Sequence, residues 1–428
     1  MSYEAASMPA PTLAGSSARA RLLGPPLDLG HPALTAILIA LGAGAAIGAD
    51  LALGPLPATG AIGATLCGLL VLRHPLAGAY LLVAVVPISS GLRRDLPVPG
   101  LRISELVIVG LASLLLVSLE TRRTRPWTVV DWCALAYCVA TLGLGAAALL
   151  GRGAPLTLEH LSTLVGPFQF FLLYRAVLGV IQTEEQRRRA LALVLLASVP
   201  VSLLALLDFV EVAGIGAKLA RATGADALAL HAQQAGIELR TTGPFPHWQM
   251  LTGYLFVIVV LAVVVQLAPG RGPLPGWLTT AVALLAGGAM IATGTFVTAF
   301  GALGAALVLG VWYRRLGRVT AVLTAMAIAA ATVFGSLVAD RVAFSFSATP
   351  GSDRGALVPQ SVDYRVDLWS NELLPALSGR WLTGFGPDLP AGLSFTHTES
   401  MYLTLLFRGG VPLLLVYTGL MLALAGAA

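Results

Sequence analysis

Apolar runs long enough to cross a lipid bilayer recur along nearly the whole chain. A membrane-spanning helix needs about 20 consecutive apolar residues, because each residue advances it by only about 1.5 Å. Hydrophobic residues make up 57% of the 428 residues and charged residues only 11%, against about 25% charged in an ordinary soluble domain. The sequence therefore predicts an all-α polytopic membrane protein, folded as one helical bundle.

The apolar runs predict about twelve transmembrane helices. The last run contains Gly409, Gly410 and Pro412, which can break it into two short helices and raise the number to thirteen. The predicted spans are residues 33–53, 57–72, 75–90, 104–119, 128–150, 159–181, 190–210, 249–268, 276–294, 296–313, 319–338 and 400–427.

Arginine clusters between the spans set the predicted orientation. Because positively charged loops stay in the cytoplasm, residues 1–32 are predicted to be a cytoplasmic tail, without the features of a cleavable signal peptide. A single membrane domain then covers residues 33–428. Alternation places two long polar segments, residues 211–248 and 339–398, on the outer face. The clusters are Arg122, Arg123 and Arg125; Arg187 to Arg189; and Arg314, Arg315 and Arg318.

Three other arginines fall on the predicted outer face, against this rule: Arg93, Arg94 and Arg102. Two interpretations stay open. They can belong to a functional site, or they can contact the phosphates of membrane lipids.

Metal sites, cofactors and nucleic-acid binding have no support in the sequence. Cys67, Cys133 and Cys138 lie in apolar runs without paired spacing, which argues against a disulfide framework. The outer segments contain no Asp-x-Asp pattern and no His and Cys cluster, and the chain has no nucleotide-binding loop in a meaningful context. The net charge of +5 reflects arginines placed for topology.

The first segment that can carry chemistry is RTTGPFPHWQMLTGY, Arg240 to Tyr254. Pro244 and Pro246 favour an extended backbone before the span. This conformation is expected to hold Arg240 and His247 near the membrane surface.

The second segment is DYRVDLWSNELLPALSGRWLTGFGP, residues 363–387. Val366, Trp369, Leu373 and Leu377 repeat at helical spacing, so the segment predicts an amphipathic helix lying on the bilayer. Trp369 would then lie at headgroup depth and Arg365 on or near the first turn. A tight Gly-Phe-Gly turn follows.

The third segment is FTHTESMY, residues 395–402, directly before the last span. It places His397 and Glu399 at the depth of a lipid headgroup, where either is a candidate general base. A histidine satisfied by its own loop is the simpler interpretation of His397 alone.

The arginines of these segments suit phosphate, because a guanidinium group matches phosphate oxygens and keeps its charge. An alternative stays open for Arg240 and Arg365. Each can snorkel to the interface or pair with a nearby carboxylate, Glu238 or Asp363.

In this order, the segments resemble the O-antigen ligase and polymerase superfamily of bacterial membrane enzymes, which transfer glycans from undecaprenyl diphosphate. The family's pattern of Arg, Gly, an aromatic residue and Pro before a span is similar to Arg240, Gly243, Phe245 and Pro246. Its pattern of Arg, Trp, a short helix and a Gly-x-Gly turn is similar to Arg365, Trp369, Gly384 and Gly386.

The third family motif is a His followed closely by His-Asn and a helix ending in Gly, and the stretch from His397 to Tyr402 resembles it. Glu399 and Ser400 stand where His-Asn is usual. A second departure precedes Val297, where many members have Ser-Arg and this chain reads ATGTFVTAF. Arg93 or Arg94 is a candidate to replace that arginine, as is Arg354.

The resemblance implies an inverting, metal-independent and cofactor-free glycosyl transfer. His397 or Glu399 would be the base, and the substrate would contact His247, Trp369 and Tyr402. The diphosphate of the donor, an undecaprenyl-diphosphate-linked glycan, would be held by Arg240, Arg365, Arg93 and Arg94. The acceptor would be a second lipid-linked glycan for a polymerase or a lipid A core for a ligase. The departure from His-Asn slightly favours a polymerase.

The resemblance also implies a location in the bacterial inner membrane, with the active site facing the periplasm. Two other classes stay open. A transporter or flippase of lipid-linked glycans would place ionisable residues near the bilayer midplane, whereas Asp131 and Arg175 lie near predicted cytoplasmic ends. A structural subunit of a membrane complex would leave the outer Arg, His and Glu residues unexplained.

Overall fold

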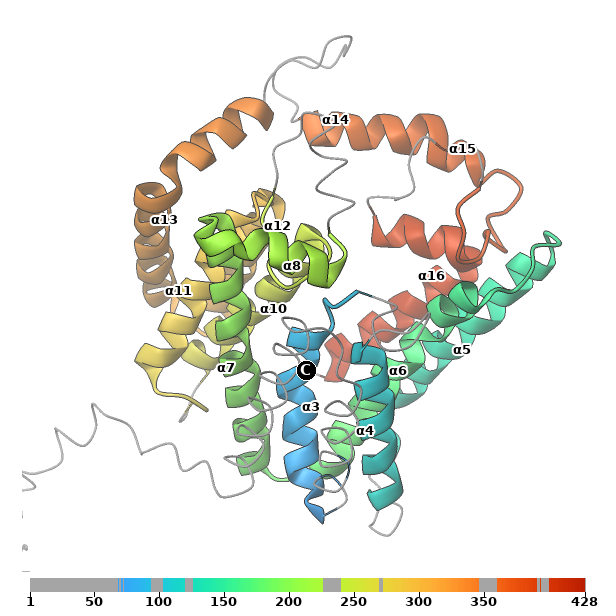
Figure 1. Ribbon diagram of the computed structural model, residues 1–428, viewed down its shortest axis with the longest axis horizontal. Coiled ribbons are helices and arrows are strands. Elements are labelled where there is room, and N and C mark those ends of the chain that lie inside the picture. Colours follow the sequence, from blue (N-terminus) through green and yellow to red (C-terminus); the bar gives the residue numbers. More distant parts are fainter. Residues whose placement is uncertain are drawn as a thin grey trace, which may run out of the picture.

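The computed structural model describes residues 73–93, 103–119, 126–225, 240–268, 272–345, 360–390 and 400–427, and the single residues 68, 71 and 393. All regular elements in these ranges are helices (Figure 1). An all-α fold is therefore confirmed for the described part of the chain. The predicted span at 33–53 and nearly all of the one at 57–72 lie outside it.

The ten later predicted spans each coincide with a helix, usually within one or two residues. The helices are α3 (Pro75–Ser89), α4 (Ile103–Leu119), α5 (Val129–Leu150), α6 (Leu158–Val180), α7 (Glu184–Phe209), α10 (Trp248–Leu267), α11 (Gly276–Ala292), α12 (Phe296–Trp312), α13 (Leu316–Ser345) and α16 (Met401–Ala427).

Two helices are longer than their apolar runs. The α7 helix begins at Glu184, because Thr183 and Gln186 form a capping box in which each side chain bonds the backbone N–H of the other, at 3.1 and 3.2 Å. Its first turns therefore include the arginine cluster, which pairs with Glu184 and Glu185. The α13 helix continues to Ser345, seven residues past its predicted end at 338.

Five of the described helices are long and apolar enough to cross a membrane: α5, α6, α7, α10 and α16. Shorter apolar helices occur at Pro75–Ser89, Val107–Leu116, Gly276–Ala292 and Phe296–Trp312. These helices support a membrane protein, and the total of twelve spans stays a prediction.

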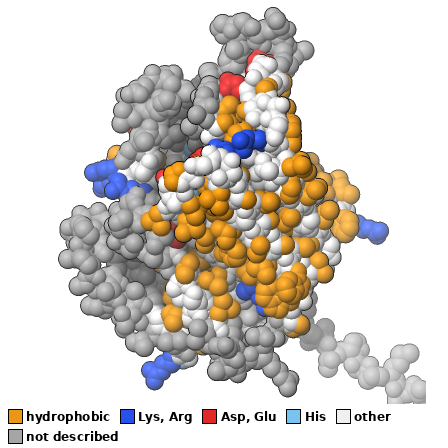
Figure 2. Space-filling view, turned by 90° about the vertical axis from the view of Figure 1, so that its right-hand side faces the viewer, with side chains coloured by type: hydrophobic (Ala, Val, Ile, Leu, Met, Phe, Trp, Pro, Cys, Tyr) orange, Lys and Arg blue, Asp and Glu red, His pale blue; other side chains and the backbone are white. Residues whose placement is uncertain are grey.

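A broad apolar surface covers much of the side of the molecule shown in Figure 2, and only a few Lys or Arg side chains interrupt it. Several large apolar side chains of α5 and α6 are more than half exposed: Trp132, Val139, Leu150, Leu158 and Phe170. Water would not favour such a surface, whereas lipid chains would.

The helices pack side by side in an order that differs from the chain order. α16 packs on α5, and α5 packs on α6. α6 packs on α4, α4 on α3, and α3 on α7. α7 packs on α11, which leads through α10 and α12 to α13. One apolar core lies among α3, α4, α6 and α7, and a second lies among α7, α10 and α11.

One end of the bundle carries two further helical segments across it, α8 (Ile215–Thr223) and α14 (Gln360–Asp367). They run roughly at right angles to α3 and α7 at the top of Figure 1. We call this end the α8 end. It corresponds to the predicted outer face, since both long polar segments contribute to it.

The amphipathic helix predicted after residue 363 differs from expectation. α14 passes into a π-helix, η2 (Leu368–Leu373), and then α15 (Leu374–Ala376). A π-helix bonds residue i to i+5, which shifts the apolar stripe. Leu368, Leu373 and Leu377 are buried, while Val366 is exposed. The stripe packs on Phe385 and α16, so protein and not lipid covers it.

The predicted break in α16 is confirmed. Gly409 and Gly410 have non-helical backbone angles, with φ −153° and +68°. The broken helix leaves backbone groups to be satisfied elsewhere. The Val411 N–H donates to the Trp381 carbonyl at 2.7 Å, and the Phe385 N–H donates to the Phe407 carbonyl. The Gly-Phe-Gly turn is therefore joined to the break.

Candidate functional site

The segment that begins with Arg240 is held at the α8 end by a carboxylate. Asp208, in the last turn of α7, accepts hydrogen bonds from the backbone N–H groups of Thr242 and Gly243, at 3.1 and 3.0 Å. Such bonds to a charged acceptor are stronger than bonds between neutral groups. Asp208 thus fixes the backbone two residues after Arg240.

Two glycines allow this segment to lie close to its neighbours. Gly243 has φ +52°, and a Cβ there would lie 3.1 Å from Cβ of Ala205 on α7. A Cβ on Gly91 would lie 1.6 Å from the carbonyl oxygen of Pro244. The segment is therefore packed against α7 on one side and the end of α3 on the other.

Arg240, Trp248 and His247 lie in contact at the start of α10. The guanidinium carbon of Arg240 lies 5.0 Å from the Trp248 ring centroid, and the His247 ring lies 4.0 Å from the same ring. His247 caps α10, because its Nδ1 accepts a hydrogen bond from the Gln249 N–H at 3.1 Å. Stacking engages the face of a guanidinium group, while its N–H donors lie in its plane and suit phosphate oxygens.

Arg93 lies at the end of α8, two residues beyond the contact of Gly91 with Pro244. It is exposed, and its backbone N–H donates to the Ala222 carbonyl at the end of α8, at 3.1 Å. The structure therefore brings the segments of Arg93 and Arg240 together through the contact of Gly91 with Pro244. Arg94 lies outside the described residues.

A second polar group surrounds the Gly-Phe-Gly turn. Gly384 and Gly386 have φ of +63° and +86°, and a Cβ on them would lie 2.5 Å from the Phe407 carbonyl oxygen and 2.8 Å from that of Gly145. Phe385 is thereby wedged between α16 and α5. The guanidinium carbons of Arg152 and Arg380 lie 5.6 and 5.2 Å from its ring centroid.

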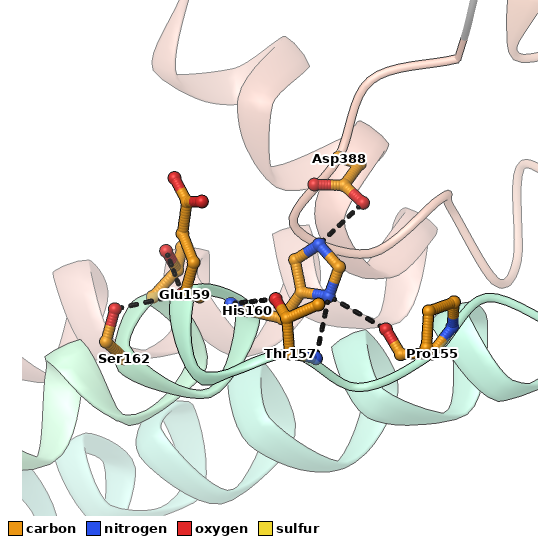
Figure 3. Close-up of polar contacts among 7 residues, drawn as sticks. Pro155, Thr157, Glu159, His160, Ser162 and Asp388 are labelled. Carbon is orange, nitrogen blue, oxygen red and sulfur yellow. Dashed lines mark hydrogen bonds and ion pairs between the residues drawn. The ribbon is translucent and has the colours of Figure 1, made fainter. Parts of the chain in front are cut away.

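His160 joins the start of α6 to this turn (Figure 3). Its Nε2 lies 2.8 Å from the Asp388 carboxylate. Its Nδ1 lies 3.3 Å from the Thr157 N–H and 3.1 Å from the Pro155 carbonyl. One nitrogen cannot accept from the first and donate to the second at once. With a hydrogen only on Nε2, His160 donates to Asp388 and its Nδ1 can accept from Thr157, whereas a hydrogen on Nδ1 donates to the Pro155 carbonyl.

Of the other predicted site residues, Trp369 lies near this second group. Arg365 is half-buried in the last turn of α14, not the first. Trp369 packs against the core that includes Phe385 and Leu403, and Tyr402 is 64% exposed at the start of α16. His397 and Glu399, the two candidate bases, lie outside the described residues.

Comparisons with protein-family models, with curated proteins and with solved structures give no match. Within the described ranges, no group of three His, Cys, Asp or Glu residues is placed to hold a metal ion. The described chemistry of the α8 end is that of guanidinium groups, two histidines and a few carboxylates.

Five residues of these groups were not predicted from the sequence: Arg152, His160, Asp208, Arg380 and Asp388. Arg152 carried a usable signal, since it lies between two spans on the predicted outer side, where arginine is disfavoured. Asp208 carried a weaker signal, since it is a carboxylate at the end of an apolar run. Nothing local marks the pairing of His160 with Asp388, because the two residues are 228 positions apart in the chain.

Proposed function

We propose that the chain is a membrane glycosyltransferase of the O-antigen polymerase or ligase type. It would act in the bacterial inner membrane with the α8 end facing the periplasm. The observation that carries the proposal is the Arg240 segment, held by Asp208 against α7 and α3 with Arg240 in contact with Trp248. Such a held cation would lie at the membrane surface, where the diphosphate of an undecaprenyl-diphosphate-linked glycan would lie.

In the proposed reaction, an acceptor hydroxyl attacks the anomeric carbon of the donor sugar and undecaprenyl diphosphate leaves. Negative charge grows on the leaving oxygen, so guanidinium groups held in place stabilise the transition state more than the ground state. Arg240, with Arg93 and Arg365, would supply this charge. His397 or Glu399 would take the hydroxyl proton, and a single displacement inverts the anomeric configuration.

A transporter or flippase of lipid-linked glycans is the alternative. Arg175 donates to Asp131 at 2.9 Å, and Asp131 also closes the capping box of α5 with Thr128. This ion pair thus has a structural role at the start of α5. It gives less support to a charge pathway through the bundle than the arginines at the α8 end give to phosphate binding.

The deciding experiment supplies the purified protein with undecaprenyl-diphosphate-linked glycan. Released undecaprenyl diphosphate and a ladder of longer glycans are expected for a polymerase, and a single transfer that requires added lipid A core for a ligase. Movement of the lipid-linked glycan from one leaflet of a vesicle membrane to the other, with no glycan transfer, would instead establish a flippase.

The same assay tests the dependence on metal. Because guanidinium charge would replace a divalent cation at the leaving diphosphate, transfer is expected to keep its full rate in excess EDTA. A strict requirement for Mg²⁺ or Mn²⁺ would contradict the proposed role of the arginines.

A further inference from the structure

Arg152 and Arg380 place two positive charges on one aromatic ring. Both guanidinium carbons lie close to the Phe385 centroid, at 5.6 and 5.2 Å. Each contact is attractive on its own. Two like charges that share one ring repel one another, and an anion bound near the ring would offset this repulsion.

The charge of Arg152 is only partly satisfied by the protein. Its Nε and Nη2 atoms are buried, and within the described part of the chain neither has a hydrogen-bond partner. Buried polar groups are nearly always hydrogen-bonded, and an unpaired buried charge is costly. These two donors therefore point to an acceptor that the described protein atoms do not supply.

Two simpler explanations account for less. The end of α5 favours a cation near its last carbonyl groups, and Arg152 follows that helix by two residues. Neither Nε nor Nη2 is bonded to a carbonyl in the described ranges, though. A carboxylate also lies close to the Gly-Phe-Gly turn, but Asp388 already contacts His160 at 2.8 Å.

The site is held in place before any ligand arrives. Phe385 is fixed by the close approach of Gly384 to α16 and of Gly386 to α5. His160 and Asp388 tie the same turn to α6. Arg380 accepts two backbone hydrogen bonds from this turn, since the N–H groups of Thr383 and Gly384 donate to its carbonyl. Such preorganisation lowers the entropic cost of binding.

We propose that Arg152 and Arg380 form a second phosphate-binding site, for the phosphate or diphosphate of a lipid. The site lies where α5 ends and α6 begins, two helices that are long and apolar enough to cross a membrane, and guanidinium groups match phosphate oxygens. It is separate from the Arg240 group, which lies at the start of α10 and beside α8. If the proposed function holds, and only then, the bound lipid is the phosphorylated acceptor.

The test measures binding and does not depend on transfer. Full-length protein in phosphatidylcholine nanodiscs is titrated with farnesyl diphosphate, and the bound number is counted by native mass spectrometry. Two diphosphates per chain are expected for the wild type. Arg152→Gln and Arg380→Gln are each expected to weaken one site about tenfold or more while the other is unchanged. Arg221→Gln, an exposed arginine of α8, is the matched control.

Separate arms identify the source of the phosphate. The titration is repeated in nanodiscs that contain phosphatidylglycerol. Loss of farnesyl diphosphate binding at this site alone would assign the site to a membrane phospholipid, because the phospholipid then competes for it. Persistence of farnesyl diphosphate binding would assign the site to an isoprenoid diphosphate. Both outcomes support a phosphate site. Unchanged stoichiometry and affinity in Arg152→Gln and Arg380→Gln would overturn it, whatever the transfer assay shows.

Thermal unfolding separates this role from a structural one. Because Nε and Nη2 of Arg152 have no partner in the described protein, Arg152→Gln is expected to unfold near the wild-type temperature without ligand. Farnesyl diphosphate should stabilise the wild type more than the variant. If Arg152→Gln lowered the unfolding temperature strongly, and by the same amount with and without farnesyl diphosphate, Arg152 would only support the fold.

Discussion

Arg240 is the residue whose phosphate-binding role is a prediction from the sequence and whose surroundings only the structure describes. The sequence placed an arginine at the membrane surface. The structure adds its contact with Trp248 and the hydrogen bonds of Asp208 to the two residues that follow Thr241. The contact with Trp248 restricts the Arg240 side chain, whereas a flexible surface arginine would lose more orientational freedom on binding phosphate.

Substitution of Arg240 tests this role. Arg240→Ala is expected to lower the rate of glycan transfer about 100- to 1000-fold, since one donor to a developing negative charge contributes on the order of 3 kcal/mol. Arg240→Lys should recover part of the loss, because it keeps the charge but not the planar donors. The readout is transfer from undecaprenyl-diphosphate-linked glycan. Arg221→Ala, on the same end of the bundle, is the control, and equal losses in both would remove the assignment.

Asp208 positions the Arg240 segment through its hydrogen bonds to the backbone N–H groups of Thr242 and Gly243. Asp208→Asn keeps the size of the side chain but removes its charge and one acceptor oxygen. Amide exchange at Thr242 and Gly243 is expected to speed up about tenfold or more, since such bonds contribute about 1.5–3 kcal/mol. Hydrogen–deuterium exchange measures it, and Glu211→Gln, an exposed carboxylate just beyond α7, should leave it unchanged. Unaltered exchange in Asp208→Asn would show that the segment is held by packing alone.

At the scale of elements, apolar run length predicted the described helices closely, because a lipid-facing helix must satisfy all its backbone groups internally. The same rule says nothing of helices that protein covers. The sequence therefore predicts that the apolar stripe after residue 363 faces the bilayer. In the structure, with the π-helix at Leu368–Leu373, the stripe packs on α16 instead. The contact of His160 with Asp388 was equally hidden, because tertiary packing alone brings α6 to the Gly-Phe-Gly turn.

The joint between that turn and the broken α16 gives the element-scale prediction. Gly384→Ala and Gly379→Ala both force a left-handed backbone on alanine, which costs about 1–2 kcal/mol. Only Gly384 has a close neighbour, with the Phe407 carbonyl oxygen 2.5 Å from an added Cβ, whereas nothing lies within 4 Å at Gly379. Gly384→Ala should therefore lower the thermal unfolding temperature by clearly more than Gly379→Ala. Equal shifts would mean that the turn is not wedged against α16.

At the scale of the whole molecule, the predicted orientation decides which substrate can reach the arginines. Arg187 to Arg189 lie in the first turns of α7 and Asp208 lies in its last turn, whereas the cluster at residues 122–125 lies outside the described residues. A lipid-linked glycan presented in the periplasm can reach Arg240 and Arg152 only if the α8 end lies there. Successive spans cross the membrane in opposite directions, so the side on which a loop lies depends on whether an odd or an even number of spans precedes it.

Single cysteines test this orientation in a chain whose Cys67, Cys133 and Cys138 are replaced by serine. Arg221→Cys and Glu159→Cys, both exposed at the α8 end, should react with a membrane-impermeant maleimide on intact spheroplasts. Arg187→Cys and Gly317→Cys, exposed at the opposite end, should react only after the membrane is permeabilised. The reverse pattern would place both arginine groups in the cytoplasm. Glycan transfer in the periplasm would then be impossible for this chain, even if phosphate binding at Arg152 and Arg380 persisted.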